Sequence, residues 1–227
     1  MSKEKSLKIF LMREKDFKKI EKKDIDVLIL SKKILENFEE GRKILERLFL
    51  LKRKKNFLIG IEGKDYKKDK AYLDLKFYGI PAIDIFFPFL KEEKEPIHFS
   101  NSGLNHVLLG IMNKNNIGIG IDLIEVIKEM KKKNFFYVSR LMQNLRWARK
   151  KRVNLCLINF DCFDVIDVKH FLISIGFDTK QAKKAFDFVF LKKQLNKEIF
   201  EHKRGKMYFY KKDEKINLIE YLIALKN

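Results

Sequence analysis

Six short stretches of the chain are almost continuously apolar, and polar or turn-forming residues bound each of them. They lie at 7–11, 25–30, 57–62, 82–87, 117–123 and 153–159. Runs of this length without hydrophobic–polar alternation are typical of parallel strands that are buried on both faces of a sheet. The pattern therefore predicts six strands of a mainly parallel sheet.

Helical segments separate these runs. The spacing of apolar residues predicts helices over 32–54, 70–78, 104–113 and 135–152. Alternating strands and helices predict an α/β fold with right-handed crossovers. No Gly-, Ser- or Pro-rich linker divides the chain, so we expect 1–227 to form a single domain. The spacing alone does not distinguish a closed barrel from an open sheet, and 183–191 or 206–210 are candidates for additional strands.

The final stretch, 192–227, differs in character from the rest of the chain. It is polar and basic over 192–206 and apolar over 216–225. We expect this C-terminal extension to pack on the main domain or on a partner, because so apolar an end would not remain in water.

Composition narrows the class of protein. Apolar residues make up 46% of the chain, which is ample for a core. No apolar run approaches the roughly 18 residues that a membrane span needs, and the N-terminus lacks the layout of a signal peptide, so we expect no membrane partner and a cytoplasmic location. Cys156 and Cys162 are too sparse for a disulfide framework or a zinc site.

Charge is the second strong feature of the sequence. The chain holds 50 Lys and Arg against 31 Asp and Glu, a net charge of +19, which favours an anionic partner. A Lys-rich surface that serves solubility or thermal stability is the alternative. Residues 128–152 hold ten Lys and Arg against Glu129 alone, and residues 42–55 hold seven against Glu46 alone. A charge spread merely for solubility would mix its signs more evenly.

A helical wheel of the 135–152 segment predicts which side chains meet a partner. It places Val138, Leu141, Leu145 and Ala148 on the side that faces the core, and Gln143, Arg146, Trp147 and Lys150 on the opposite side. Trp147 and Gln143 are therefore candidates for an intermolecular contact, since Trp dominates binding hot spots. A boundary Trp that packs under a neighbouring helix is an equally good interpretation.

The segment 100–160 resembles a known family in the order of its motifs. An Asn-His-Val-Leu helix start at 105–108 is followed by the strand at 117–123, a Trp-bearing basic helix at 140–150 and an apolar strand at 154–159. Upstream, 59–65 resembles the family's strand that ends in Gly-Gly-Asp, with Lys64 in place of the second glycine. Over roughly 56–190, the chain resembles protein component 3 of archaeal ribonuclease P, the homologue of the thirty-kilodalton protein subunit of the eukaryotic enzyme.

The resemblance implies an irregular or incomplete TIM-type (β/α) barrel and a non-catalytic role. It implies a subunit of the ribonucleoprotein that removes the 5′ leader from precursor tRNA, in which the RNA does the chemistry with Mg²⁺. Its partners would be that catalytic RNA, ribonuclease P protein component 2, other small basic subunits and, indirectly, precursor tRNA. Together with the charge clusters, it makes twelve cations candidates for contacts to RNA: Lys52, Arg53, Lys54, Lys131, Lys132, Lys133, Arg140, Arg146, Arg149, Lys150, Lys151 and Arg152.

Metal-dependent phosphoesterases use a similar barrel, so a catalytic role is an alternative. They need His and Asp ligands that converge at strand ends. The first predicted strand contains no His, and the four histidines of the chain are far apart. We therefore expect no catalytic residue, metal ligand or cofactor on this chain, and expect His106 to pack or cap. The strand-end acids Glu62, Asp65, Asp84 and Asp122 are expected to cap helices or organise loops rather than bind Mg²⁺.

Two other functions stay open at this point. One is a free-standing metal-dependent phosphoesterase or nuclease on the same barrel. The other is a generic basic nucleic-acid-binding domain with no role in tRNA maturation.

Overall fold

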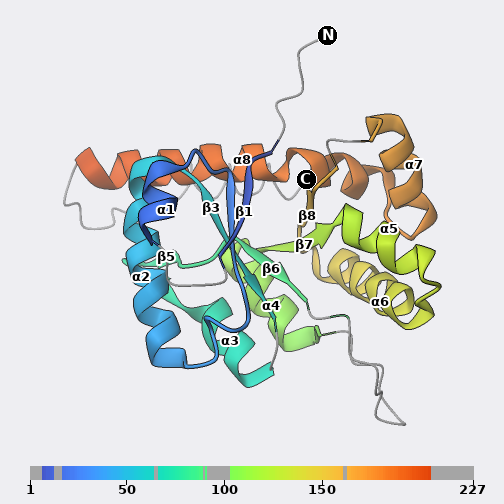
Figure 1. The fold of residues 1–227 in the computed structure, drawn as a ribbon, viewed down its shortest axis with the longest axis horizontal. Helices are drawn as coiled ribbons and strands as arrows, with labels where there is room; N and C mark the ends of the chain where they lie inside the picture. Colours follow the sequence, from blue (N-terminus) through green and yellow to red (C-terminus); the bar gives the residue numbers. More distant parts are fainter. Residues whose placement is uncertain are drawn as a thin grey trace.

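Six strands form one parallel sheet whose spatial order, β1-β2-β3-β6-β7-β8, follows the chain. In this computed structural model the described residues are 7–12, 17–63, 66–88, 90, 103–160 and 163–205. The strands are β1 (Ile9–Met12), β2 (Val27–Leu30), β3 (Leu58–Glu62), β6 (Ile85–Phe87), β7 (Gly118–Asp122) and β8 (Leu155–Ile158). All six predicted strands are confirmed. Sequential order of parallel strands is the order of a barrel wall, and here the sheet curls into half of one (Figure 1).

Alternate residues of the strands point to two separate cores. On the outer side of the sheet, Leu28, Ile59 and Ile119 belong to the main cluster of buried residues, which the flanking helices complete. On the inner side, Val27, Leu58 and Ile85 belong to a second cluster. The sheet is therefore buried on both faces, as the continuous apolar runs predict.

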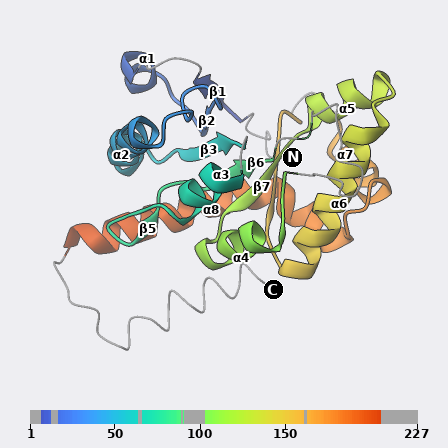
Figure 2. The same ribbon diagram turned by 90° about the horizontal axis from the view of Figure 1, so that it is seen from below.

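Helices follow most strands and cover the outer side of the sheet (Figures 1 and 2). Short polar side chains start them, because a side-chain oxygen satisfies the free amides of the first turn: Asn37, Asn105, Asp122, Asn134 and Asp164 all accept such a bond. The helices are α1 (Phe17–Lys22), α2 (Phe38–Lys55), α3 (Tyr66–Asp74), α4 (His106–Asn115), α5 (Leu123–Lys131), α6 (Phe135–Lys151) and α7 (Val165–Ser174).

The helix predicted over 70–78 ends early. α3 stops at Asp74, and a small antiparallel hairpin follows, formed by β4 (Lys76–Phe77) and β5 (Ile80–Pro81). Tyr78 and Gly79 connect them with φ values of 54° and 75°, the left-handed conformation that tight hairpin turns require. The predicted helices over 32–54, 104–113 and 135–152 correspond to α2, α4 and α6.

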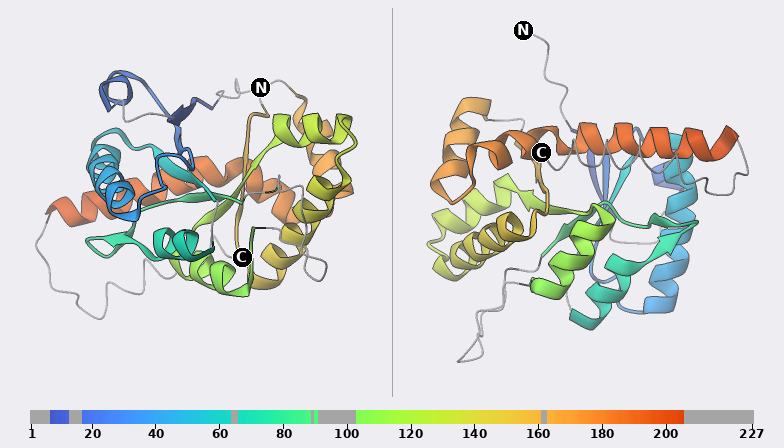
Figure 3. Two further views of the ribbon diagram at one scale, coloured as in Figure 1. Left: turned by 60° about the horizontal axis from the view of Figure 1, so that its bottom comes forward. Right: turned by 180° about the vertical axis from the view of Figure 1, so that it is seen from behind.

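The long helix α8 (Thr179–Gly205) takes the position that further barrel strands would occupy. It crosses the sheet on the inner side, where Phe188 and Val189 join the second core (Figures 1 and 3). Gly118 makes room for it, since a Cβ there would lie 2.6 Å from Cζ of Phe188. The prediction of a strand at 183–191 is therefore wrong, while the one at 206–210 lies outside the described residues.

The expected α/β fold is confirmed, and in place of the irregular or incomplete TIM-type barrel the sheet forms a half-barrel whose inner side α8 covers. Residues 192–205 of the expected C-terminal extension belong to α8, where Leu195 and Phe200 are buried. Residues 206–227 lie outside the described residues. None of the helices in the described part of the chain has the length and hydropathy to cross a membrane.

Candidate nucleic-acid interface

Carboxylates at the carboxyl edge of the sheet serve the local structure. Asp122 ends β7, caps α5 by accepting from Glu125 N at 3.2 Å, and accepts a second bond from Asn159 Nδ2 at 2.7 Å. Burial raises the pKa of Asp122 above its ordinary value. Glu62 ends β3 and accepts from Lys32 N at 3.2 Å, which holds the loop after β2. The predicted capping and loop-organising roles of these two acids are confirmed, while Asp65 lies outside the described residues.

The same edge brings no ligand cluster together. Within the described ranges, no three His, Cys, Asp or Glu side chains are placed so that they could hold a metal ion. His106 is the exposed first residue of α4, and Asn105 supplies the cap by accepting from Val107 N and Leu108 N. The expectation that His106 packs or caps is therefore wrong.

Asp84 lies at the opposite, amino edge of the sheet, just before β6. Its carboxylate accepts from Lys52 Nζ at 2.6 Å, from Ile59 N at 2.9 Å and from Asn196 Nδ2 at 3.1 Å. Burial alone would raise the pKa of Asp84, but Lys52, Lys192 and these bonds lower it below its ordinary value. Asp84 therefore ties α2, β3 and α8 together, and its place at the stable end of such a sheet indicates a structural role.

Lys52 does not belong to the basic surface. Its side chain is fully buried against Asp84, so it has no access to phosphates, and the prediction that it contacts RNA is wrong. Lys192 of α8 is buried beside the same pair and donates to Asn116 O at 2.7 Å. Burial lowers the pKa of Lys192 to about 8, against the opposing attraction of Asp84. Both lysines lie in segments that are basic in sequence, yet their side chains belong to the interior.

Arg140 is the second predicted RNA contact that lies inside the protein. It is 1% exposed and its Nη1 donates to Leu90 O at 3.0 Å, which ties α6 to the segment after β6. A contact from Arg140 to RNA is therefore excluded in this conformation. The polar spacing that places Arg140 with Asn144 on one side of α6 follows the buried side of the helix, not its solvent side.

The remaining cations of the 128–152 segment are exposed on α5 and α6. Lys128 lies on α5, three lie at the turn between the two helices, and five lie in the last turns of α6 and at its C-cap: Lys131, Lys132, Lys133, Arg146, Arg149, Lys150, Lys151 and Arg152. Cations at the end of a helix also interact favourably with its dipole. Arg53 is half-buried and Lys54 is exposed, but both belong to α2, which lies at the opposite end of the sheet from α6 (Figures 1 and 2). The two predicted clusters therefore form separate surfaces.

Trp147 lies on the flank of α6. Its side chain is partly buried and packs against the main core, so the predicted orientation away from the core is wrong. The buried side of α6 is centred on Tyr137, Leu141 and Ala148, whereas Val138 is only half-buried. The predicted wheel is thus rotated relative to the observed one. Gln143 is half-buried, and a contact from either residue to a partner stays a prediction.

Sequence reasoning missed two aromatic side chains at the start of α6. Phe135 and Phe136 are 76% and 59% exposed, directly after the exposed run from Lys131 to Lys133. The signal was present in the sequence, because two adjacent aromatics cannot both face the core from one helix.

The comparisons with known proteins concern the fold. No protein-family model matches the chain, and no curated protein matches it. Its structure is similar to a chain in a cryo-EM structure of archaeal ribonuclease P with mature tRNA. The match covers 91% of this chain and 98% of that chain, with a TM-score of 0.53 and 16% sequence identity. The likeness establishes that the two chains share a fold over nearly their whole lengths.

Proposed function

We propose that this chain is a protein subunit of ribonuclease P, the ribonucleoprotein that removes the 5′ leader from precursor tRNA. The observation that carries the proposal is the shared fold with a chain of archaeal ribonuclease P over 91% of this chain. The order of motifs over 56–190 supports it independently, because that resemblance rests on residues and not on the shape of the sheet.

In this proposal the RNA subunit performs catalysis with Mg²⁺, and the chain stabilises the active fold of that RNA. The exposed cations of α5 and α6 supply the phosphate contacts, which are independent of base sequence. The chain pairs with ribonuclease P protein component 2 and acts in the cytoplasm beside other small basic subunits. Precursor tRNA is contacted indirectly, through the assembled particle.

Residues at the carboxyl edge of the sheet agree with a non-catalytic subunit. A phosphoesterase on this scaffold would need several ligands there, and Glu62 and Asp122 are engaged in hydrogen bonds to the backbone instead. The larger cluster of exposed cations lies on α5 and α6 at one end of the sheet, where an extended polyanion has access to it.

Reconstitution tests the proposal. The tagged full-length chain should capture one structured RNA and several small basic proteins from its source cells, and sequencing should identify that RNA. Added to the RNA and the partner proteins, the chain should raise cleavage of precursor tRNA or lower the Mg²⁺ requirement. The chain alone should leave the leader intact. If the purified chain alone cleaves the leader and Asp122→Ala abolishes that cleavage, the chain is a phosphoesterase instead. If the chain captures many unrelated RNAs, it is a generic nucleic-acid-binding domain.

A further inference from the structure

We infer that the turn between α5 and α6, together with the outward side of α6, binds an unpaired RNA strand whose bases stack on Phe135 and Phe136. The inference rests on the proposed function in one respect, that the partner is RNA. It adds the mode of recognition and the side chains that provide it.

The two rings are unusually accessible for their size. Phe135 is 76% exposed and Phe136 is 59% exposed, and Met130 at the end of α5 is 39% exposed. Burial of apolar surface is favourable, so two uncovered rings leave a large gain in binding free energy available to a ligand. Aromatic rings stack on unpaired bases of any sequence, because every base has a π-face.

The turn that carries the rings is held by a network around Glu129. This carboxylate is 5% exposed and accepts from Lys132 Nζ and Asn134 Nδ2, both at 2.9 Å. Asn134 in turn caps α6 by accepting from Tyr137 N at 3.1 Å. Lys133 reverses the chain with a φ of 56°. The rings therefore project from a fixed turn, and binding does not have to order it.

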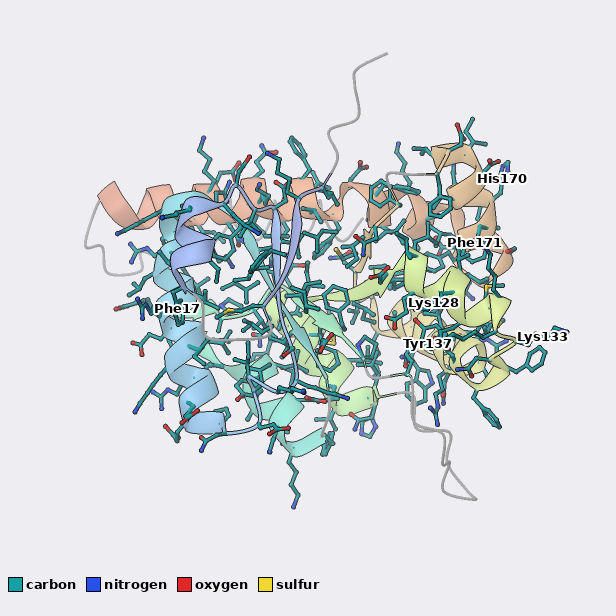
Figure 4. All side chains as sticks on the ribbon, in the orientation of Figure 1. Phe17, Lys128, Lys133, Tyr137, His170 and Phe171 are labelled. Atoms are coloured by element: carbon teal, nitrogen blue, oxygen red, sulfur yellow. The ribbon has the colours of Figure 1, made fainter. Side chains whose placement is uncertain are left out.

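Charge around the rings selects RNA over a protein surface. Lys128, Lys131 and Lys133 are exposed and form no ion pair with any residue that the structure describes. Figure 4 shows Lys133 at the tip of the turn, at one extreme of the molecule. The whole of α6 contains no Asp or Glu. An apolar protein partner would have to leave these ammonium groups without counter-charges, whereas phosphates supply them.

The outward side of α6 continues the site toward the other cations. Ser139, Gln143, Arg146 and Lys150 follow Phe135 and Phe136 on this side, at the three- and four-residue spacing of one helix face. The helix has 17 residues and is therefore about 25 Å long, enough for several nucleotides. Bases that stack at one end leave their backbone running toward Arg146 and Lys150. Stacking requires a free base face, so the bound strand is unpaired there.

The test compares leucine and aromatic substitutions in the full-length chain. F135L/F136L keeps apolar area but removes the flat rings, and F135W/F136W keeps them. F190L is the matched control, because Phe190 is 71% exposed but lies on α8. The probes are a short uridine-rich single strand and a fully paired RNA duplex of equal length, and binding is measured by fluorescence anisotropy. F135L/F136L should weaken binding of the single strand at least about fivefold, since loss of stacking on one base has at least that effect.

Three further results should accompany that loss. Binding of the duplex should change little, and F135W/F136W and F190L should bind as the unaltered chain does. The slope of log affinity against log salt should stay constant because no cation is removed. Unaltered binding by F135L/F136L overturns the inference. If the leucine pair binds RNA normally while a serine pair loses the partner protein, the patch docks protein instead. If charge reversal on α6 weakens RNA binding and F135L/F136L does not, the proposed function stands and base stacking on the two rings is excluded.

Discussion

Lys52 Nζ lies 2.6 Å from Oδ2 of Asp84, and the two side chains are 0% and 2% exposed. The pair joins the last turns of α2 to the start of β6, and Asn196 of α8 completes it. A buried ion pair contributes little net stability relative to an apolar pair of the same size, but removal of one partner leaves an uncompensated charge in the interior. Asp84 faces two such cations, Lys52 and Lys192.

Asp84→Ala should therefore destabilise the fold strongly. The substitution leaves Lys52 without its carboxylate partner, and the expected loss in the free energy of unfolding is about 3–5 kcal/mol. Asp74→Ala is the control, because Asp74 is exposed at the end of α3 and its removal should change stability by less than about 0.5 kcal/mol. Urea unfolding followed by circular dichroism measures both. If Asp84→Ala and Asp74→Ala have the same free energy of unfolding, the Lys52–Asp84 pair is not needed for stability.

Lys192 should make stability depend on pH in the alkaline range. Burial lowers its pKa to about 8 from an ordinary 10.5, so between these values the unfolded chain binds more protons than the folded one. The free energy of unfolding should therefore rise with pH from about 8 to about 10.5, by up to about 3 kcal/mol. The rise should be absent from Lys192→Met, which holds an apolar side chain in the same place. If the free energy of unfolding depends on pH in the same way in the unaltered chain and in Lys192→Met, the pKa of Lys192 is not lowered.

Gly118 and Gly110 should respond in opposite directions to the same change. A Cβ at Gly118 would lie 2.6 Å from Phe188 Cζ, so Gly118→Ala should displace α8 and reduce the free energy of unfolding by about 1–3 kcal/mol. Gly110 lies inside α4, and a Cβ there would meet no heavy atom within 4 Å, so Gly110→Ala should increase the free energy of unfolding by up to about 1 kcal/mol. Thermal melting compares the two variants. If Gly118→Ala and Gly110→Ala both lower the stability, the account of the contact between the sheet and α8 is wrong.

Charge reversal at the exposed end of α6 should weaken RNA binding without unfolding the chain. Arg146, Arg149 and Lys150 are all exposed, and their change to Glu should make the slope of log affinity against log salt shallower by about 0.7–0.9 for each phosphate that is no longer neutralised. Lys180 and Lys183, exposed at the start of α8, provide the control pair. If both sets of substitutions leave the slope of log affinity against log salt unchanged, the RNA binds to a surface other than the end of α6.

Trp147 should report on the same surface. It is the only Trp in the chain, so tryptophan emission comes from this one side chain, which packs partly against the core. Binding of RNA along α6 should quench or shift that emission. Trp147→Ala should reduce the free energy of unfolding by about 1–3 kcal/mol, less than the roughly 3–5 kcal/mol of a fully buried Trp. If RNA does not alter the tryptophan emission, Trp147 does not lie at the RNA-binding surface.

The sequence was sufficient for the strands and insufficient for α8. Continuous apolar runs identified all six strands because both faces of the sheet are buried. Residues 188–191 form a short apolar run, but they belong to α8, which crosses the inner side of the sheet. A short apolar run does not distinguish a buried helix from a strand. The expectation that further strands would supplement an incomplete barrel then favoured the wrong choice.

Counting charges located the basic segments but not the direction of each side chain. Lys52 follows Leu45 and Leu48 at helical spacing and shares their buried side, and Arg140 shares the buried side of Tyr137 and Asn144. Helical spacing from apolar residues therefore indicated in the sequence that these two cations face the interior. The partner of each across the fold, Asp84 or the carbonyl of Leu90, depends on tertiary contacts that no local pattern reveals.

The position of α8 also determines when a nascent chain can finish folding. All six strands precede α8, and contacts such as that from Lys193 to Asp26 join residues 167 positions apart. Until the ribosome has released α8, the inner face of the sheet, including Val27, Leu58 and Ile85, lacks the side chains of Phe188 and Val189 that pack on it. Folding of this chain is therefore expected to be completed late in synthesis and slowly, and its incomplete forms are expected to need chaperones.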